Sequence, residues 1–200
     1  MPAPIDFYFD FSSPYGYLAA VRIDALAAKY RRDVSWHPIL LGPAFKASGN
    51  APLTQQPLKG DYARRDFLRT AKFLGIPFSM PTPFPVSTHN AARAFYWQQD
   101  RDAAKAKELA QAFYQHYFVE ARDISNAETI IDIAVRHDVN RDEISAALAD
   151  PAVKERLKNE VDASLARGVF GSPYIIVDRE PFWGSDRFEQ IEAWLKSGGW

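Results

Sequence analysis

The chain has 200 residues, a formal net charge of −1 and no cysteine. A net charge near zero gives no electrostatic reason to expect nucleic acid or an anionic membrane as a partner. The lack of cysteine excludes disulfides, thiolate metal ligands, a cysteine nucleophile and a CxxC redox pair, so any sulfur chemistry needs sulfur from a ligand. No apolar run approaches the roughly eighteen residues needed to cross a bilayer. Because residues 1–4 also lack the regions of a signal peptide, we expect a cytoplasmic protein.

The chain opens with a predicted β-α-β unit. Alternating apolar residues predict a strand over 5–10, a helix follows over about 14–30, and residues 34–41 predict a second strand. Ser13 stands before Pro14, which is a favourable pairing of N-cap and first helical residue. The free N–H groups and positive dipole end of that helix would favour an anionic ligand atom. The alternative is that Ser13 is only a helix cap.

The middle of the chain changes from loop to helix. Glycine and proline residues over 42–59 favour a loop, a helix is expected over about 61–74, and a proline-rich extended connector follows over 77–85. Two helix starts are marked by capping signals, a capping box over Ser125–Glu128 and a cap at Asp150. The further predicted helices cover residues 88–99, 103–118, 126–138, 141–149 and 152–167.

The C-terminal part returns to strands. Residues 174–177 predict a buried strand, 178–180 a turn, and 181–183 the start of a return strand. Ser185 and Asp186 are expected to cap a last helix that ends at Gly198. The order predicts an α/β fold, a thioredoxin-like sheet (β-α-β … β-β-α) with a large all-helical domain inserted in the middle. The predicted domains are residues 1–59 with 169–200, and the inserted residues 60–168.

Three further segments could carry chemistry. The Ser172-Pro173 step could be cis and, in such a sheet, would face the start of the first helix, where its backbone could pair with a peptide-like ligand. Ser185 and Asp186 could hold a ligand's carboxylate and ammonium group. The loop residues Lys46, Asn50 and Lys59 could receive a carboxylate. The alternatives are a plain loop proline, an ordinary helix cap and solvated loop side chains.

Other motifs offer less. The four histidines lack metal-ligand spacing, and no GxSxG, P-loop or GxGxxG motif occurs, so a metal site, a serine hydrolase and a nucleotide site are not predicted. Aromatic residues recur at helical spacing in the middle of the chain. They suit a helical core, although they could also form the wall of a flat aromatic ligand site. These residues are Tyr96, Trp97, Phe113, Tyr114, Tyr117 and Phe118.

Five short motifs occur in order along the whole chain. They cover residues 10–15, 46–50, 58–60, 171–173 and 182–187, and read DFSSPY, KASGN, LKG, GSP and FWGSDR. In this order and spacing they resemble the 2-hydroxychromene-2-carboxylate isomerases. That family is related to the kappa-class glutathione transferases, and the resemblance implies a DsbA-type thioredoxin fold.

The resemblance also implies glutathione as cofactor and assigns residues to it. Ser13 would stand where DsbA-type oxidoreductases place their nucleophilic cysteine, with its hydroxyl bonded to the glutathione sulfur as the catalytic contact. The remaining glutathione contacts would be Ser172 and Pro173 for the cysteinyl part, Ser185 and Asp186 for the γ-glutamyl part, and Asn50 and Lys59. Tyr15, Lys46, Phe84 and Trp183 would shape the pocket for a small aromatic carboxylate substrate.

The implied reaction converts 2-hydroxychromene-2-carboxylate, or a similar aromatic ring-cleavage product, to trans-o-hydroxybenzylidenepyruvate. It proceeds by reversible thiolate addition, ring opening, bond rotation and elimination. The family also implies a homodimer. Gly16 and Arg65 depart from the serine and asparagine that the pattern usually has, which leaves the acceptor open. A kappa-class-like glutathione transferase and a non-catalytic thioredoxin-fold binding protein therefore stand as alternatives.

Overall fold

The computed structural model describes residues 3–200, so Met1 and Pro2, on which the signal-peptide expectation partly rests, lie outside the described residues. Its centre is a four-stranded sheet in the order β2-β1-β3-β4. Only β1 and β2 are parallel, and β3 is antiparallel to both β1 and β4. Because β1 and β3 run in opposite directions, the end of β1 and the start of β3 share one edge of the sheet. The strands are β1 (Ile5–Phe9), β2 (Val34–Pro38), β3 (Tyr174–Val177) and β4 (Glu180–Trp183).

The two faces of the sheet are covered differently. Phe7 and Phe9 point into the main core, which α1 and the central helices complete. Tyr8, Tyr174 and Ile176 belong to a smaller apolar cluster on the other face. The helices are α1 (Pro14–Lys29), α2 (Leu41–Ser48), α3 (Lys59–Leu74), α4 (His89–Gln99), α5 (Ala103–Phe118), α6 (Ala127–Arg136), α7 (Arg141–Ala149), α8 (Pro151–Ala166) and α9 (Phe188–Ser197), with a 3₁₀ turn at Leu53–Gln55.

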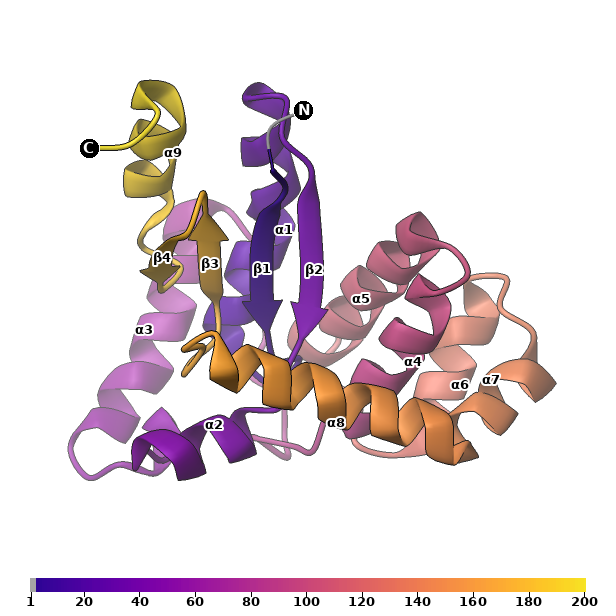
Figure 1. The fold of residues 1–200 in the computed structure, drawn as a ribbon. Coiled ribbons are helices and arrows are strands. Elements are labelled where there is room, and N and C mark those ends of the chain that lie inside the picture. Colours follow the sequence, from indigo (N-terminus) through magenta and orange to yellow (C-terminus); the bar gives the residue numbers. More distant parts are fainter. Residues whose placement is uncertain (1–2) are drawn as a thin grey trace.

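The inserted helices lie on two sides of the sheet. Figure 1 shows α4 to α7 beyond β2, with α8 running across from them, whereas α3 lies on the β4 side. The helix α3 packs against α1 and the 3₁₀ turn. This separation places α3 beside the sheet edge where β1 ends and β3 begins.

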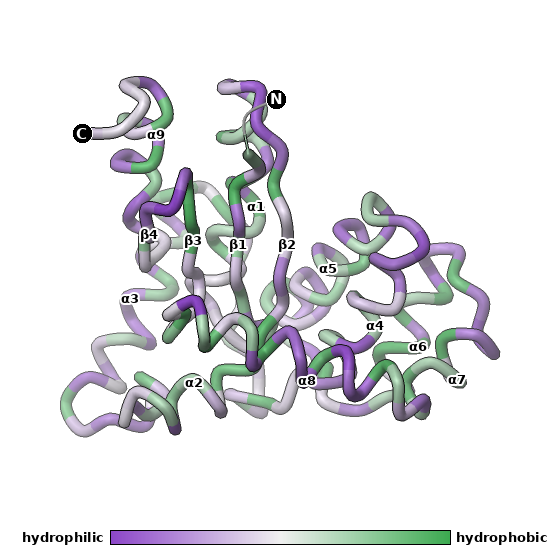
Figure 2. The backbone as a smooth tube through the Cα atoms, viewed as in Figure 1, coloured by the Kyte–Doolittle hydropathy of each residue, from purple (hydrophilic) through white to green (hydrophobic). Residues whose placement is uncertain are grey.

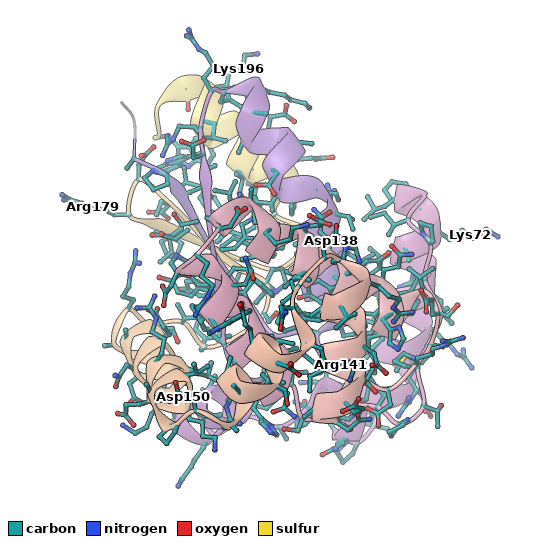
Figure 3. All side chains as sticks on the ribbon, turned by 90° about the vertical axis from the view of Figure 1, so that its right-hand side faces the viewer. Lys72, Asp138, Arg141, Asp150, Arg179 and Lys196 are labelled. Atoms are coloured by element: carbon teal, nitrogen blue, oxygen red, sulfur yellow. The ribbon has the colours of Figure 1, made fainter. Side chains whose placement is uncertain are left out.

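Hydrophobic residues concentrate in the centre of the fold and polar residues on its surface. Figure 2 shows hydrophobic colour along β3, whose residues are all buried, and mixed colour along the surrounding helices. Figure 3 shows Lys72, Arg179 and Lys196 projecting from the periphery of the molecule. Of the described residues, no helix is both long enough and apolar enough to span a bilayer.

Several predicted elements are confirmed within a residue or two, and four details were wrong. Residues 41–48 form helix α2, where a loop was predicted, and β2 ends at Pro38 rather than at residue 41. Asn126, not Ser125, caps α6 through its side chain, which accepts from Thr129 N. The last helix starts at Phe188 without a side-chain cap, so neither Ser185 nor Asp186 serves as one.

The aromatic residues of α4 and α5 are core, as their helical spacing indicated. All six are at least 93% buried, and none lines the cleft described below. Three of their hydroxyls bond backbone carbonyls: Tyr96 to Pro38, Tyr114 to Asp10 and Tyr117 to Pro83.

Candidate functional site

The two Ser-Pro segments meet at the sheet edge. Ser13 has the extended backbone of an N-cap, and its Oγ accepts a hydrogen bond from Gly16 N at 3.0 Å. The same hydroxyl donates to the carbonyl of Ser172 at 2.9 Å. Pro14 occupies the first helical position, and the Ser172–Pro173 peptide bond is cis. The predicted cap and the predicted facing of the two loops are therefore confirmed.

The glycine that departs from the family pattern lies in this junction. A Cβ atom on Gly16 would lie 2.7 Å from Ser172 Oγ and 2.9 Å from the hydroxyl of Tyr114. Both distances are shorter than real Cβ contacts allow. In this chain the two hydroxyls occupy the space that a serine side chain would need.

A buried carboxylate supports the same junction. Asp10 is 4% exposed and accepts hydrogen bonds from Ser12 N, Leu41 N and Thr88 Oγ1 at 2.7–2.8 Å. Its own backbone N–H donates to Ser172 Oγ at 2.9 Å. Burial raises the pKa of this carboxyl, and the hydrogen bonds to it act in the opposite direction. Sequence reasoning gave Asp10 no role, because a polar residue ending an apolar strand does not reveal partners far along the chain.

A cleft of about 1030 Å³ opens over this junction. The structure brings ten of the eleven predicted site residues to its walls. Lys46 is the exception, since it is exposed on α2 and does not line the cleft. The structure therefore does not bring Lys46 to the cleft, and its role in the acceptor pocket stays a prediction. The ten lining residues are Ser13, Tyr15, Asn50, Lys59, Phe84, Ser172, Pro173, Trp183, Ser185 and Asp186.

One wall is the loop between β4 and α9. Gly184 N donates to the carbonyl of Pro173 at 3.1 Å, which ties this loop to the cis-proline segment. The guanidinium of Arg22 in α1 donates to the carbonyl of Ser185 at 3.1 Å, so the loop is also held to the first helix. Ser185 is buried, whereas the Asp186 side chain is 71% exposed. The wall therefore places the Asp186 carboxylate on the rim, where its Oδ2 lies 3.4 Å from the guanidinium of Arg187.

The opposite wall is aromatic and comes from α1, α3 and the proline-rich connector. The Tyr15 ring packs edge-on against Phe67 with 4.9 Å between centroids, and Phe67 packs against Phe84 at 6.4 Å. The Tyr15 hydroxyl donates to the carboxylate of Asp66, and Thr70 also contacts that carboxylate. Burial first, and then the hydrogen bond to Asp66, raise the pKa of Tyr15. Sequence reasoning missed Asp66, Phe67 and Thr70, since nothing local in α3 indicates that it faces the start of α1.

This arrangement can bind an anionic atom and a peptide-like ligand. The start of a sixteen-residue helix offers N–H groups and a hydroxyl at one point. The cis-proline loop offers backbone groups next to it, and Lys59, Arg187 and Asp186 provide both signs of charge on the walls. Across residues 3–200 no group of three His, Asp or Glu side chains is placed to hold a metal ion.

The fold and the site define a thioredoxin-fold protein with serine at the start of the first helix. The chain belongs to the DsbA-like thioredoxin domain family, whose model matches residues 4–196. The predicted fold class is thereby confirmed.

Individual relatives agree with the resemblance found in the motifs. A 2-hydroxychromene-2-carboxylate isomerase of Sphingobium xenophagum is 29% identical over 197 residues, covering 98% of this chain and 99% of its own. A glutathione S-transferase kappa 1 of Caenorhabditis elegans is 27% identical, covering 96% and 90%. A solved structure of a 2-hydroxychromene-2-carboxylate isomerase superposes with a TM-score of 0.87 at 28% identity, covering 96% of this chain and 94% of the other. Isomerases and glutathione transferases are thus the enzymes that this chain is similar to.

Proposed function

We propose that the protein is a glutathione-dependent isomerase that converts 2-hydroxychromene-2-carboxylate, or a similar aromatic ring-cleavage product, to trans-o-hydroxybenzylidenepyruvate. One observation carries the proposal. In a chain without cysteine, the Ser13 hydroxyl lies at the start of α1, 2.9 Å from the carbonyl of the residue before cis Pro173, at the base of a cleft. A thiol brought by a ligand would meet both the hydroxyl and the helix N–H groups there.

The polar groups of the cleft match those of glutathione. Its thiol suits Ser13, and its cysteinyl amide suits the backbone of Ser172, whose carbonyl has a second lone pair beside the one that Ser13 uses. The γ-glutamyl ammonium suits Asp186, and the carboxylates suit Ser185 with the nearby helix start and Lys59. Asn50 lines the same cleft and would contact the peptide.

Bound glutathione would supply a thiolate nucleophile that this cysteine-free chain lacks. The chain's own part is to hold that charge and orient the acceptor. A free thiol has a pKa near 8.5, and a helix N-terminus lowers such values. Ser13 would add a hydrogen bond to the anion, which requires its hydroxyl to turn away from the Ser172 carbonyl. Tyr15, Phe84 and Trp183 would hold the aromatic acceptor.

A kappa-class-like glutathione transferase is the second candidate. The observation that favours it is the position of Lys46 outside the cleft, which removes one cation expected to bind a carboxylate acceptor. A neutral aromatic electrophile would not need that cation.

Two assays with glutathione separate these candidates. Turnover of 2-hydroxychromene-2-carboxylate without consumption of glutathione supports the isomerase. Conjugation of chlorodinitrobenzene without isomerisation supports the transferase. Cytoplasmic location and a homodimer belong to the same proposal, and sedimentation of the purified protein tests the latter.

A further inference from the structure

The aromatic wall of the cleft contains a carboxylate, Asp66, among its rings. Burial acts to raise its pKa, but hydrogen bonds from Tyr15 and Arg69 outweigh that effect and lower it. Its side chain is 19% exposed, and it lines the cleft together with Tyr15 and Thr70. A negative charge therefore lies among the rings where an aromatic acceptor would be bound.

The hydroxyl and guanidinium groups around this carboxylate already donate hydrogen bonds to it. Tyr15 donates its only hydroxyl proton to Asp66 Oδ2, and Thr70 Oγ1 donates to the same oxygen at 3.4 Å. Arg69, whose side chain is 60% exposed, donates to Oδ1. A carboxylate can accept about four hydrogen bonds and a phenol oxygen can accept as well. Toward a ligand, the pair of Tyr15 and Asp66 thus offers lone pairs and no donor.

The position of the pair relates it to the reaction. Tyr15 follows Ser13 by two residues, in the first turn of α1, and its ring contacts Phe67. The pair therefore lies beside the place proposed for the glutathione sulfur. Arg69, the cation bonded to Asp66 on α3, does not line the cleft.

We propose that Tyr15 and Asp66 form a hydrogen-bond-accepting site that selects acceptors with a ring hydroxyl, a phenol or a hemiketal. The carboxylate of such an acceptor would point away from Asp66. Asp66 is then a specificity-determining residue of the site described under the proposed function, on which this inference rests. Losing a hydrogen bond to a charged group in a buried site reduces affinity by about tenfold to a hundredfold.

The test is binding to the protein, with and without glutathione, measured by calorimetry. The two probes are trans-o-hydroxybenzylidenepyruvate and its phenol methyl ether, which keeps the ring and the carboxylate but cannot donate. We expect wild type to bind the phenol about tenfold to a hundredfold more tightly than the ether. Equal affinities, or no binding of the phenol under either condition, would overturn the proposal.

Three variants test which residue causes the preference for the phenol over the ether. Asp66→Asn should reduce the preference to within about threefold. Tyr15→Phe should keep the preference, because the carboxylate still accepts. Asp61→Asn, an exposed acid on the same helix that does not line the cleft, should leave it unchanged. A preference that persists in Asp66→Asn but disappears in Tyr15→Phe would assign the recognition of the ring hydroxyl to the Tyr15 oxygen alone and refute the role of Asp66.

The same samples separate this inference from the proposed function. Titration with glutathione alone tests the cofactor, and the ratio of phenol to ether affinity tests Asp66. If the protein does not bind glutathione but binds the phenol more tightly than the ether, only the proposed use of glutathione is refuted. Thermal unfolding of each variant shows whether it is folded.

Discussion

Replacing Ser13 by alanine removes two observed hydrogen bonds and one proposed one. The observed bonds are the cap to Gly16 N and the bond to the Ser172 carbonyl. Losing the cap costs about 0.5–2 kcal/mol and losing the second bond about 1 kcal/mol. Ser13→Ala should therefore lower the free energy of unfolding by about 1.5–3 kcal/mol.

The effect on turnover follows from the proposed third bond. A hydrogen bond to an anion contributes about 1.5–3 kcal/mol, but the hydroxyl first gives up its bond to Ser172, worth about 1 kcal/mol. The net loss of about 0.5–2 kcal/mol predicts that turnover falls by about twofold to thirtyfold, which is less than the full loss of one donor to an anion would give. The apparent pKa of the pH–rate profile should also rise, since the thiolate loses a stabilising contact.

Steady-state kinetics of chromene carboxylate isomerisation at saturating glutathione measures this effect. Asn126→Ala is the matched control, because it removes an N-cap bond of 2.8 Å to Thr129 N far from the cleft. It should lose the stability of one helix cap, about 0.5–2 kcal/mol, and keep its turnover. Wild-type turnover in a folded Ser13→Ala variant would refute the role of Ser13.

Three further predictions concern the junction and the sheet. Gly16→Ser should destabilise the protein by about 1–3 kcal/mol, measured by urea unfolding. The cost should be smaller in a Ser172→Ala background, because one of the two obstructing hydroxyls is gone. Equal costs in both backgrounds would contradict the packing argument. Asp10→Ala should cost about 3 kcal/mol or more, because three donors lose their acceptor, and a change below about 1 kcal/mol would show that water replaces it. Burial acts to raise the pKa of Asp6, but hydrogen bonds with His37 and Arg167 outweigh burial, so the pKa of the folded state is lowered below 3.8. The stability that Asp6 contributes is therefore present above pH 3.8 and is lost as the pH falls through the lower folded-state value. Asp6→Asn should thus cost up to about 1 kcal/mol at pH 7, with the difference from wild type shrinking in acid; a constant difference down to pH 2 would exclude this linkage.

The start of α1 and most helices were predictable because their signals are local. Ser13-Pro14 and Asp150-Pro151 both form the caps that the sequence indicates. The helix α2 was missed because Gly42 and Pro43 resemble loop residues. They lie in the first turn, where no N–H partner is needed, and Gly49 ends the helix with a φ of 70°.

What holds α2 in place could not be read from its own residues. Its N-cap is Leu40, which offers no side-chain acceptor, and the N–H of Leu41 is bonded instead by the carboxylate of Asp10 from the end of β1. The bond from Tyr15 to Asp66 is of the same kind, because it joins residues 51 positions apart. Such contacts arise only once the sheet has set the positions of α1, α2 and α3. The cleft residues missed on α3, which are Asp66, Phe67 and Thr70, face the start of α1 and are far from it in the sequence.

Binding of reduced glutathione to the purified protein is the most direct test of the central claim. Isothermal titration should give a saturable heat with one site per chain and a Kd at or below about 1 mM. Ser13→Ala should weaken that binding, and Asn126→Ala should not. No heat of binding at millimolar glutathione would contradict the account and leave a non-catalytic thioredoxin-fold binding protein as the remaining interpretation.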